Sequence, residues 1–341
     1  MKKSLMTLGV LALFVLMAYG QEKKFALYSV AFYNMENLFD TIHDEGKNDY
    51  EYLPNGTNQW NTMKYKAKLK NMSEILSMLS TDKLPMGPAI IGVSEIENYR
   101  VLEDILKQPA LADRGYQYVH YEGADQRGVD CAFFYNPKLF ELTNSKLVPY
   151  VYINDTVHKT RGFLIASGNI AGEKMHFIVN HWPSRAAASP ARERAGEQVR
   201  AIKDSLLRED SAAKIVIMGD MNDDPMDKST AVALGAKRKP ADVGPTDLYN
   251  PWWDTLKKGY GTLMYKGKWN LFDQIVFTGN LLGTDRSTLK FYKHEIFRRD
   301  FMFQKEGKYK GYPKRTQAGG VWLNGYSDHL PTIIYLIKEV K

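Results

Sequence analysis

Short runs of apolar, β-branched residues recur along the whole chain, and their length is typical of strands. Between several of these runs lie segments with amphipathic spacing and charged outer faces, at residues 62–79, 99–107 and 190–207, which predict helices. The pattern therefore predicts a mixed α/β fold. The strand-like runs are residues 25–34, 88–95, 128–136, 146–154, 175–182, 214–220, 271–279 and 331–340.

No linker rich in Pro, Gly or Ser divides the chain, and no internal repeat is present. We therefore expect residues 21–341 to form one large domain. The segment 298–324 is the most loop-like stretch, because it is rich in Gly, Lys and Tyr. Long loops of this kind often carry function.

The first 20 residues differ from the rest of the chain. Lys2 and Lys3 precede an apolar run that ends in the small-residue sequence Ala18-Tyr19-Gly20. This is the pattern of a secretory signal peptide, with cleavage near Gly20 and Gln21, and it predicts a secreted or periplasmic protein without a stable membrane anchor. The alternative is an uncleaved anchor, for which the apolar run is shorter than the roughly 20 residues that a bilayer requires.

Composition supports a folded protein, since 44% of the residues are hydrophobic and 12% are aromatic. The single cysteine, Cys131, excludes an internal disulfide, and its apolar surroundings predict a buried residue. The formal charge of +7 becomes +5 when Lys2 and Lys3 are removed, which mildly favours anionic substrates. The Lys-rich run 64–70 is interpreted as a solvated helix face.

Polar residues gather where the strand-like runs end. Asn34, Glu95, His181 and Asp220 each follow an apolar run, and the pair Asp328-His329 precedes the last one. Each feature alone is explained by a turn or a cap. Together they supply the oxygen ligands that Mg²⁺ prefers and a histidine that can move a proton, which favours metal-assisted hydrolysis of a phosphoester.

At these positions the sequence resembles the endonuclease/exonuclease/phosphatase superfamily, which includes DNase I-like nucleases, abasic-site endonucleases, neutral sphingomyelinases and inositol-polyphosphate 5-phosphatases. The resemblance implies a four-layer α/β sandwich, with two mixed β-sheets packed face to face and helices outside. It also implies that the site lies at one end of the sandwich. The matching residues are Asn34, Glu95, Arg127, Asp130, His181, Asp220, Asn222, Asp273, Asp328 and His329.

The resemblance also implies roles for these residues. Glu95 would be the principal ligand of Mg²⁺, or of Mn²⁺, with Asn34 and Asp328 close to the metal. The sequence "GDMNDDP" would be a buried strand that delivers Asp220 and Asn222 to position and activate water, with Pro225 ending the strand. Asp273 would orient His329, which acts as a base or as a donor to the phosphate. His181 would stabilise the leaving oxygen, and Arg127 would bind a phosphate.

Several residues do not follow from the resemblance. Glu36, Asn37, Glu97 and Asn98 are interpreted either as supports of the site or as ordinary polar residues at strand ends. The disulfides of secreted DNase I-type enzymes cannot form with one cysteine. The remaining histidines lack an acidic or motif context and are interpreted as surface or hydrogen-bonded core residues: His43, His120, His158, His176 and His294.

The leading hypothesis is a divalent-metal-dependent phosphodiesterase, with nucleic acid as the first candidate substrate. The basic loop at residues 305–315 mixes cations with Tyr309 and Tyr312, as surfaces that bind single strands do. A phosphatase, or a phospholipid- or sphingomyelin-type phosphodiesterase, would use the same site on a smaller phosphorylated substrate. A non-catalytic binding protein on the same fold is the third alternative.

Overall fold

The computed structural model describes residues 23–153, 155 and 157–340. The predicted signal peptide at residues 1–20 lies outside these ranges. Within them, none of the helices has both the length and the apolar character needed to cross a membrane.

The first sheet has six strands in the order β14-β17-β1-β2-β4-β3. The N-terminal strand β1 lies at its centre, antiparallel to the C-terminal strand β17 and parallel to β2. Both parallel and antiparallel neighbours occur, so the sheet is mixed. Its strands are β1 (Lys24–Leu38), β2 (Ile90–Ile96), β3 (Gln117–His120), β4 (Asp130–Tyr135), β14 (Lys290–Ile296) and β17 (Thr332–Val340).

The second sheet has seven strands in the order β5-β6-β7-β8-β13-β10-β9. Its central strands β7 and β8 are parallel, whereas β8 and β13 are antiparallel. The strands are β5 (Glu141–Val148), β6 (Phe163–Ile170), β7 (Glu173–His181), β8 (Lys214–Asp220), β9 (Ala236–Lys237), β10 (Leu248–Tyr249) and β13 (Asp273–Thr278).

Alternating side chains hold the layers together. In β1, Val30 and Phe32 pack between the two sheets, whereas Ala31 and Tyr33 pack under the helices on the outer face. In the second sheet, β8 directs Val216 and Met218 toward the core between the sheets. This alternation with period two places one buried face on each side of a strand, which explains the continuous apolar runs of the sequence.

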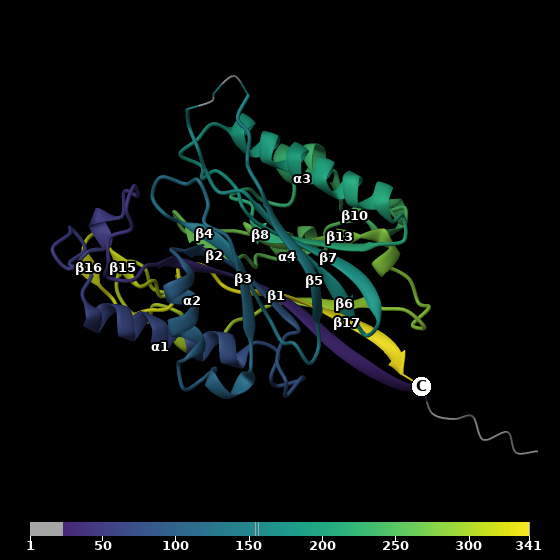
Figure 1. The fold of residues 1–341 in the computed structure, drawn as a ribbon, viewed down its shortest axis with the longest axis horizontal. Helices are drawn as coiled ribbons and strands as arrows, with labels where there is room; N and C mark the ends of the chain where they lie inside the picture. The colour runs from purple at the N-terminus through teal and green to yellow at the C-terminus, as the bar shows by residue number, and fades with distance from the viewer. Residues whose placement is uncertain (1–22, 154, 156, 341) are drawn as a thin grey trace, which may run out of the picture.

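The helices cover the outer faces of the sandwich. Figure 1 shows α3 (Ser189–Glu209) along one side, with α1 (Thr62–Met78) and α2 (Tyr99–Leu106) on the opposite side. Val199 of α3 packs on the second sheet, and Leu69 of α1 packs on the first. The observed order of layers is the predicted four-layer sandwich, two mixed sheets face to face with helices outside, which confirms the expected fold class.

Short elements complete the molecule. Two small hairpins, β11-β12 and β15-β16, lie outside the large sheets. The hairpin strands are β11 (Leu263–Tyr265), β12 (Lys268–Asn270), β15 (Gln317–Ala318) and β16 (Val321–Trp322). The short helices are α4 (Trp253–Lys257), the π-helix Ser229–Ala233 and the 3₁₀ helices Tyr50–Tyr52, Ala112–Arg114, Pro240–Asp242, Gly279–Leu281 and Asp300–Met302.

Two expectations about strand ends are wrong. The run 146–154 is a strand only as far as Val148, because Pro149 has no N–H group with which to continue the ladder. Likewise, β8 ends at Asp220, well before Pro225. Asn222 therefore follows the strand, in a turn where its backbone has a positive φ of 52°.

Candidate active site

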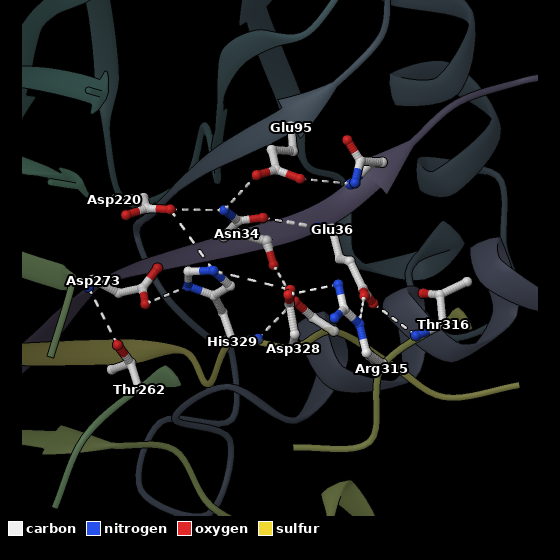
Figure 2. A network of polar contacts seen from close by, with 12 residues as sticks. Asn34, Glu36, Glu95, Asp220, Thr262, Asp273, Arg315, Thr316, Asp328 and His329 are labelled. Atoms are coloured by element: carbon white, nitrogen blue, oxygen red, sulfur yellow. Dashed lines mark hydrogen bonds and ion pairs between the residues drawn. The ribbon is translucent and has the colours of Figure 1, made fainter. Parts of the chain in front are cut away.

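The ends of five strands bring the predicted site residues together at one end of the sandwich. Asn34 lies in β1 and Glu95 in β2, which both belong to the first sheet. The second sheet contributes His181, Asp220 and Asp273, whose backbones lie side by side because Asp220 pairs in register with both of the others. Figure 2 shows how Asn34, Glu95, Asp220 and Asp273 converge with His329.

Asn34 connects the two sheets at this end. Its Nδ2 donates to Glu95 Oε1 at 3.1 Å and to Asp220 Oδ2 at 3.0 Å. His181 Nε2 lies 3.7 Å from the same two oxygens. These four side chains therefore enclose one small polar space between the sheets.

The backbone is strained where the strands enter the site. Glu36, Asn37 and Glu95 all have positive φ, between 47° and 59°, a region that non-glycine residues rarely adopt. The strand register shifts at the same places, between Asn34 and Leu38 and between Ser94 and Ile96. Such irregularities redirect a side chain and concentrate at functional sites. Here they turn the Glu95 carboxylate toward Asn34.

A buried histidine–carboxylate pair forms the second half of the site. His329 Nδ1 lies 2.7 Å from Asp273 Oδ2, and the backbone N–H of Asp273 donates to Thr262 Oγ1. His329 Nε2 points toward Asp220 Oδ2 at 3.8 Å. Asp273 and Asp220 raise the pKa of His329 well above its ordinary value, against the opposing effect of burial. The imidazole is therefore held in its protonated form.

Burial also has the largest effect on the pKa of two further groups, Asp220 and His181. Burial raises the pKa of Asp220 to about 7, while the positive charge of His329 lowers it. Burial lowers the pKa of His181 well below its ordinary value, and the charges of Arg161 and Arg127 lower it further. His181 is therefore neutral, in contrast to His329.

Asn222 reaches the site from the turn after β8. Its backbone N–H donates to Asp220 Oδ1 at 2.9 Å, and its Nδ2 donates to the Trp182 carbonyl at 3.0 Å. The turn thereby fixes the orientation of the Asp220 carboxylate.

Asp328 is paired with Arg315, at the end of the basic loop 305–315. Arg315 Nη2 lies 2.9 Å from Asp328 Oδ2, and Arg315 Nε donates to Glu36 Oε1 at 2.8 Å. The backbone N–H of Thr316 donates to the second Glu36 oxygen at 2.7 Å. The buried Lys68 donates to Thr316 Oγ1 and lies 3.9 Å from Glu36. The loop-like segment 298–324 is thus anchored beside the site, as Figure 2 shows for Arg315 and Thr316.

The interpretation of residues 64–70 as a solvated face is wrong for Lys68, which has no exposed surface. The helical period would have identified it, since Lys68 lies on the same face of α1 as Tyr65, Leu69 and Met72. A lysine on an apolar helix face requires a buried partner. Glu36 is that partner.

Two of the four residues that were interpreted either as supports of the site or as ordinary polar residues do contact the site. Glu36 supports the site through Arg315, and the Asn37 backbone N–H donates to Glu95 Oε2 at 3.0 Å. Glu97 is buried and accepts a hydrogen bond from the Asp40 backbone. Asn98 caps the N-terminus of α2.

Arg127 is not brought into direct contact with the other predicted residues. Its side chain is half exposed, and its Nε lies 3.4 Å from Asp125 Oδ1. The same Asp125 pairs with the buried Arg161, which also donates to the Trp182 carbonyl. Arg161 was not identified from the sequence because no motif surrounds it.

The remaining histidines are only partly as expected. His176 contacts Ser167 and His294 contacts Thr255, so both are hydrogen-bonded residues of the interior. Each of the other three lies next to an aspartate in the folded chain. The pairs are His43 with Asp49, His120 with Asp130, and His158 with Asp155. Cys131 is buried, as predicted.

The donor set of the site fits a divalent cation. Its side chains offer mainly carboxylate and amide oxygens, the ligands that Mg²⁺ prefers. The connected set holds the five carboxylates of Glu36, Glu95, Asp220, Asp273 and Asp328 beside Lys68, Arg315 and His329. Burial raises the pKa of both Glu36 and Asp220 to about 7. The positive charge of a bound cation would favour the ionised form of these carboxylates.

A four-layer sandwich with a carboxylate–histidine cluster at one end is the architecture of the endonuclease/exonuclease/phosphatase superfamily. The sequence model of the Endonuclease/Exonuclease/phosphatase family matches residues 29–338. The chain therefore belongs to this family.

Solved structures share the fold at low sequence identity. An endonuclease/exonuclease/phosphatase family protein from Bacteroides thetaiotaomicron is 15% identical, with a TM-score of 0.58 over 93% of this chain and 97% of its own. A mannosyl-6-phosphatase from the same species is 14% identical, with a TM-score of 0.56 over 91% and 99%. D. rerio TDP2 complexed with a single-strand DNA product is 14% identical, with a TM-score of 0.52 over 91% and 99%. Comparison with curated proteins found no match.

Replacing Lys68 by methionine should destabilise the protein strongly. The Lys68→Met variant leaves Glu36 buried with one partner fewer, and breaking a buried ion pair costs roughly 3 to 5 kcal/mol. Lys66→Met, on the exposed face of the same helix, is the matched control and should change stability by less than about 0.5 kcal/mol. Urea unfolding of both variants tests this, and equal midpoints would show that the buried pair contributes nothing.

Proposed function

We propose that this protein is a divalent-metal-dependent hydrolase of phosphate esters that acts outside the cytoplasm. The observation that carries the proposal is the buried pair of Asp273 and His329, whose free imidazole nitrogen faces Asp220. A positioned imidazolium, a buried carboxylate and a set of oxygen ligands are the groups that such a hydrolysis requires. Membership of the family supports the same chemistry.

Glu95, with Asn34 and Asp328, would hold Mg²⁺, and Mn²⁺ is the alternative. The bound cation supplies positive charge that stabilises the phosphate oxygens as negative charge develops on them. Asn37 fixes Glu95 from one side by a backbone hydrogen bond, and Arg315 fixes Asp328 from the other. The ligands are thus oriented by the protein itself.

Asp220 is the residue that we assign to the attacking water. Its raised pKa makes the carboxylate a stronger base than an exposed aspartate, and Asn222 fixes its orientation. Asp220 would accept a proton from the water as it attacks phosphorus. Asn222 would help to position the water with its amide oxygen.

His329 is then assigned as a hydrogen-bond donor to the phosphate. Its raised pKa keeps the imidazole protonated, and Asp273 stabilises that charge. This favours the donor role over the role of base. His181, which is neutral, would donate a hydrogen bond to the leaving oxygen. Arg127 is half exposed, and its charge lowers the pKa of His181 without direct contact; it would bind a phosphate oxygen from the solvent side.

Nucleic acid is the first candidate substrate, and small phosphorylated molecules are the second. The exposed Tyr309, with Lys308 Nζ at 5.5 Å from its ring, supports binding of a single strand along residues 305–315. The similarity to D. rerio TDP2, which was solved with a single-strand DNA product, supports the same substrate. The similarity to a mannosyl-6-phosphatase supports a small phosphate ester. A phospholipid-type phosphodiester is a further alternative. A non-catalytic role is disfavoured because every position of the site holds a chemically competent residue.

Activity should depend on a divalent cation. Phosphate ester hydrolysis by the purified protein should vanish in excess EDTA and return when Mg²⁺ or Mn²⁺ is added, because oxygen ligands bind hard cations. The assay should include p-nitrophenyl phosphate, its bis-ester and a single-stranded oligonucleotide. Undiminished turnover in excess chelator would exclude the metal from the mechanism.

Asp273 and His329 should act as one catalytic unit. His329→Ala and Asp273→Asn should each lower kcat by roughly a hundredfold or more with little change in KM, because both groups act mainly in the transition state. The double variant should be scarcely slower than the slower single variant. Kinetics and thermal unfolding should be measured on the same samples. Near-normal kcat in folded His329→Ala would remove this residue from catalysis.

Export should be visible in the mature chain. The signal-like pattern of residues 1–20 predicts cleavage near Gly20 and Gln21. Intact-mass spectrometry of protein from the cell envelope or medium should therefore find a chain that begins near Gln21. Recovery of the whole chain, with Met1, in a cytoplasmic fraction would contradict the proposed location.

A further inference from the structure

A pocket of about 370 Å³ opens beside the candidate active site. Three separate parts of the chain form it, namely the end of β1, the loop before α1, and the anchored segment 309–320. We refer to it as the rim pocket. Its polar and aromatic walls include Glu36, Asn37, Glu51, Tyr52, Asn58 and Gln317.

The rim pocket shares its inner wall with the candidate active site. Arg315, which lines the pocket, contacts Asp328 at 2.9 Å, and Asn37 donates its backbone N–H to Glu95 at 3.0 Å. Figure 2 shows Glu36 and Arg315 between Asp328 and Thr316. Arg315 and Asn37 are thus common to the wall of the pocket and to the surroundings of Asp328 and Glu95.

The pocket offers several polar side chains that the protein itself does not use. The side chains of Asn37, Glu51, Asn58 and Gln317 make no hydrogen bond to any other residue in the described part of the chain. Three amides can both donate and accept, and the carboxylate of Glu51 accepts. Such a set matches a ligand that carries several hydroxyl groups.

Aromatic rings give the pocket a fixed apolar surface. Tyr52 stacks on Phe39 with ring centroids 4.1 Å apart, and its edge packs on the buried Trp60. Trp60 in turn donates to the Phe39 carbonyl at 3.0 Å. Tyr309 also lines the pocket, and half of its surface is exposed. These rings can pack against the C–H groups of a small ring while the amides bind its hydroxyls.

The charges of the pocket disfavour a second phosphate. Among the described residues that line it, Arg315 is the one cation, and its guanidinium is already paired with Glu36 and Asp328. Glu51 adds an unpaired negative charge to the wall. A polyanion continuing into the pocket would meet repulsion, whereas an uncharged ring with hydroxyl groups would not.

We infer that the rim pocket binds the hydroxyl-bearing ring of a phosphorylated sugar, so that a sugar phosphate ester is the substrate class of the neighbouring site. The inference rests on the proposed phosphate ester hydrolysis and specifies its substrate. Water attacks phosphorus, the bond between phosphorus and the sugar oxygen breaks, and that oxygen takes up a proton. Inorganic phosphate and the free sugar leave.

The test compares substrates under one set of conditions. We would measure kcat/KM with Mg²⁺ for hexose 1-phosphates and 6-phosphates, p-nitrophenyl phosphate and a single-stranded oligodeoxynucleotide. At least one hexose phosphate should exceed p-nitrophenyl phosphate by tenfold or more, although its leaving group is poorer, because hydrogen bonds remote from the reacting centre add to transition-state binding.

Variants locate the preference in the pocket. The double variant Asn58→Ala/Gln317→Ala, and separately Glu51→Gln, should lower the ratio of hexose phosphate to p-nitrophenyl phosphate kcat/KM, by about tenfold for the double variant. The matched control Asn55→Ala/Gln304→Ala removes the same two amides outside the pocket and should keep the wild-type ratio. Thermal unfolding of each variant verifies folding.

The outcomes separate the inference from the proposed function. Metal-dependent hydrolysis of p-nitrophenyl phosphate without any preference for a hexose phosphate would overturn the inference alone. Preferential cleavage of the oligonucleotide would do the same and favour nucleic acid. An unchanged ratio in both pocket variants would also overturn it. Failure to hydrolyse any ester with Mg²⁺ or Mn²⁺ would remove the proposed function and the inference together.

Discussion

The register of β7, β8 and β13 is the constraint on which the polar end of the molecule depends. It sets His181, Asp220 and Asp273 side by side on three neighbouring strands. A shift of one residue in β8 would turn the Asp220 side chain to the other face of the sheet. The apolar residues before Asp220 prevent such a shift. Met218 packs in the core between the sheets and Ile217 in the core under α3, and the shift would place each of them in the other core. Packing of the core therefore fixes the geometry of the polar cluster.

The buried carboxylates of this cluster must be compensated by other parts of the fold. Burying a carboxylate costs free energy unless cations or hydrogen bonds compensate its charge. Lysine and arginine side chains of the protein provide part of this compensation. Lys68 from α1 and Arg315 from the segment after β14 approach Glu36 from different sides. Glu36 of β1 thus contacts both a helix and a long connection, which also contact each other through Lys68 and Thr316.

Local patterns explain how much could be predicted from the sequence. The apolar patterns predicted the mixed α/β content and the helices α1, α2 and α3, because each strand and helix buries at least one face. The order of the four layers was implied by the resemblance to the family and not by these patterns. The strand ends predicted the cluster around Asn34, Glu95 and Asp220, since short motifs carry it. The partnership of Lys68, Arg315 and Glu36 could not be predicted in the same way, because its members lie up to 279 residues apart. The backbone conformation of Glu95 could not be predicted either. Its φ is positive, and nothing in the sequence indicates this, because glutamate ordinarily has a negative φ.

The central position of β17 has a consequence for the order in which the molecule is assembled. β17 lies between β14 and β1 in the first sheet. The two neighbours of β1 are therefore β2, which follows it closely in sequence, and β17, which is separated from it by most of the described residues. During synthesis β1 must wait for almost the whole polypeptide before this edge is covered, and contacts between such distant segments slow folding. His329 and Asp328 lie just before β17 and leave the ribosome at the same late stage. The pairing of β17 with β1 therefore both completes this side of the first sheet and brings Asp328 and His329 to the charged cluster.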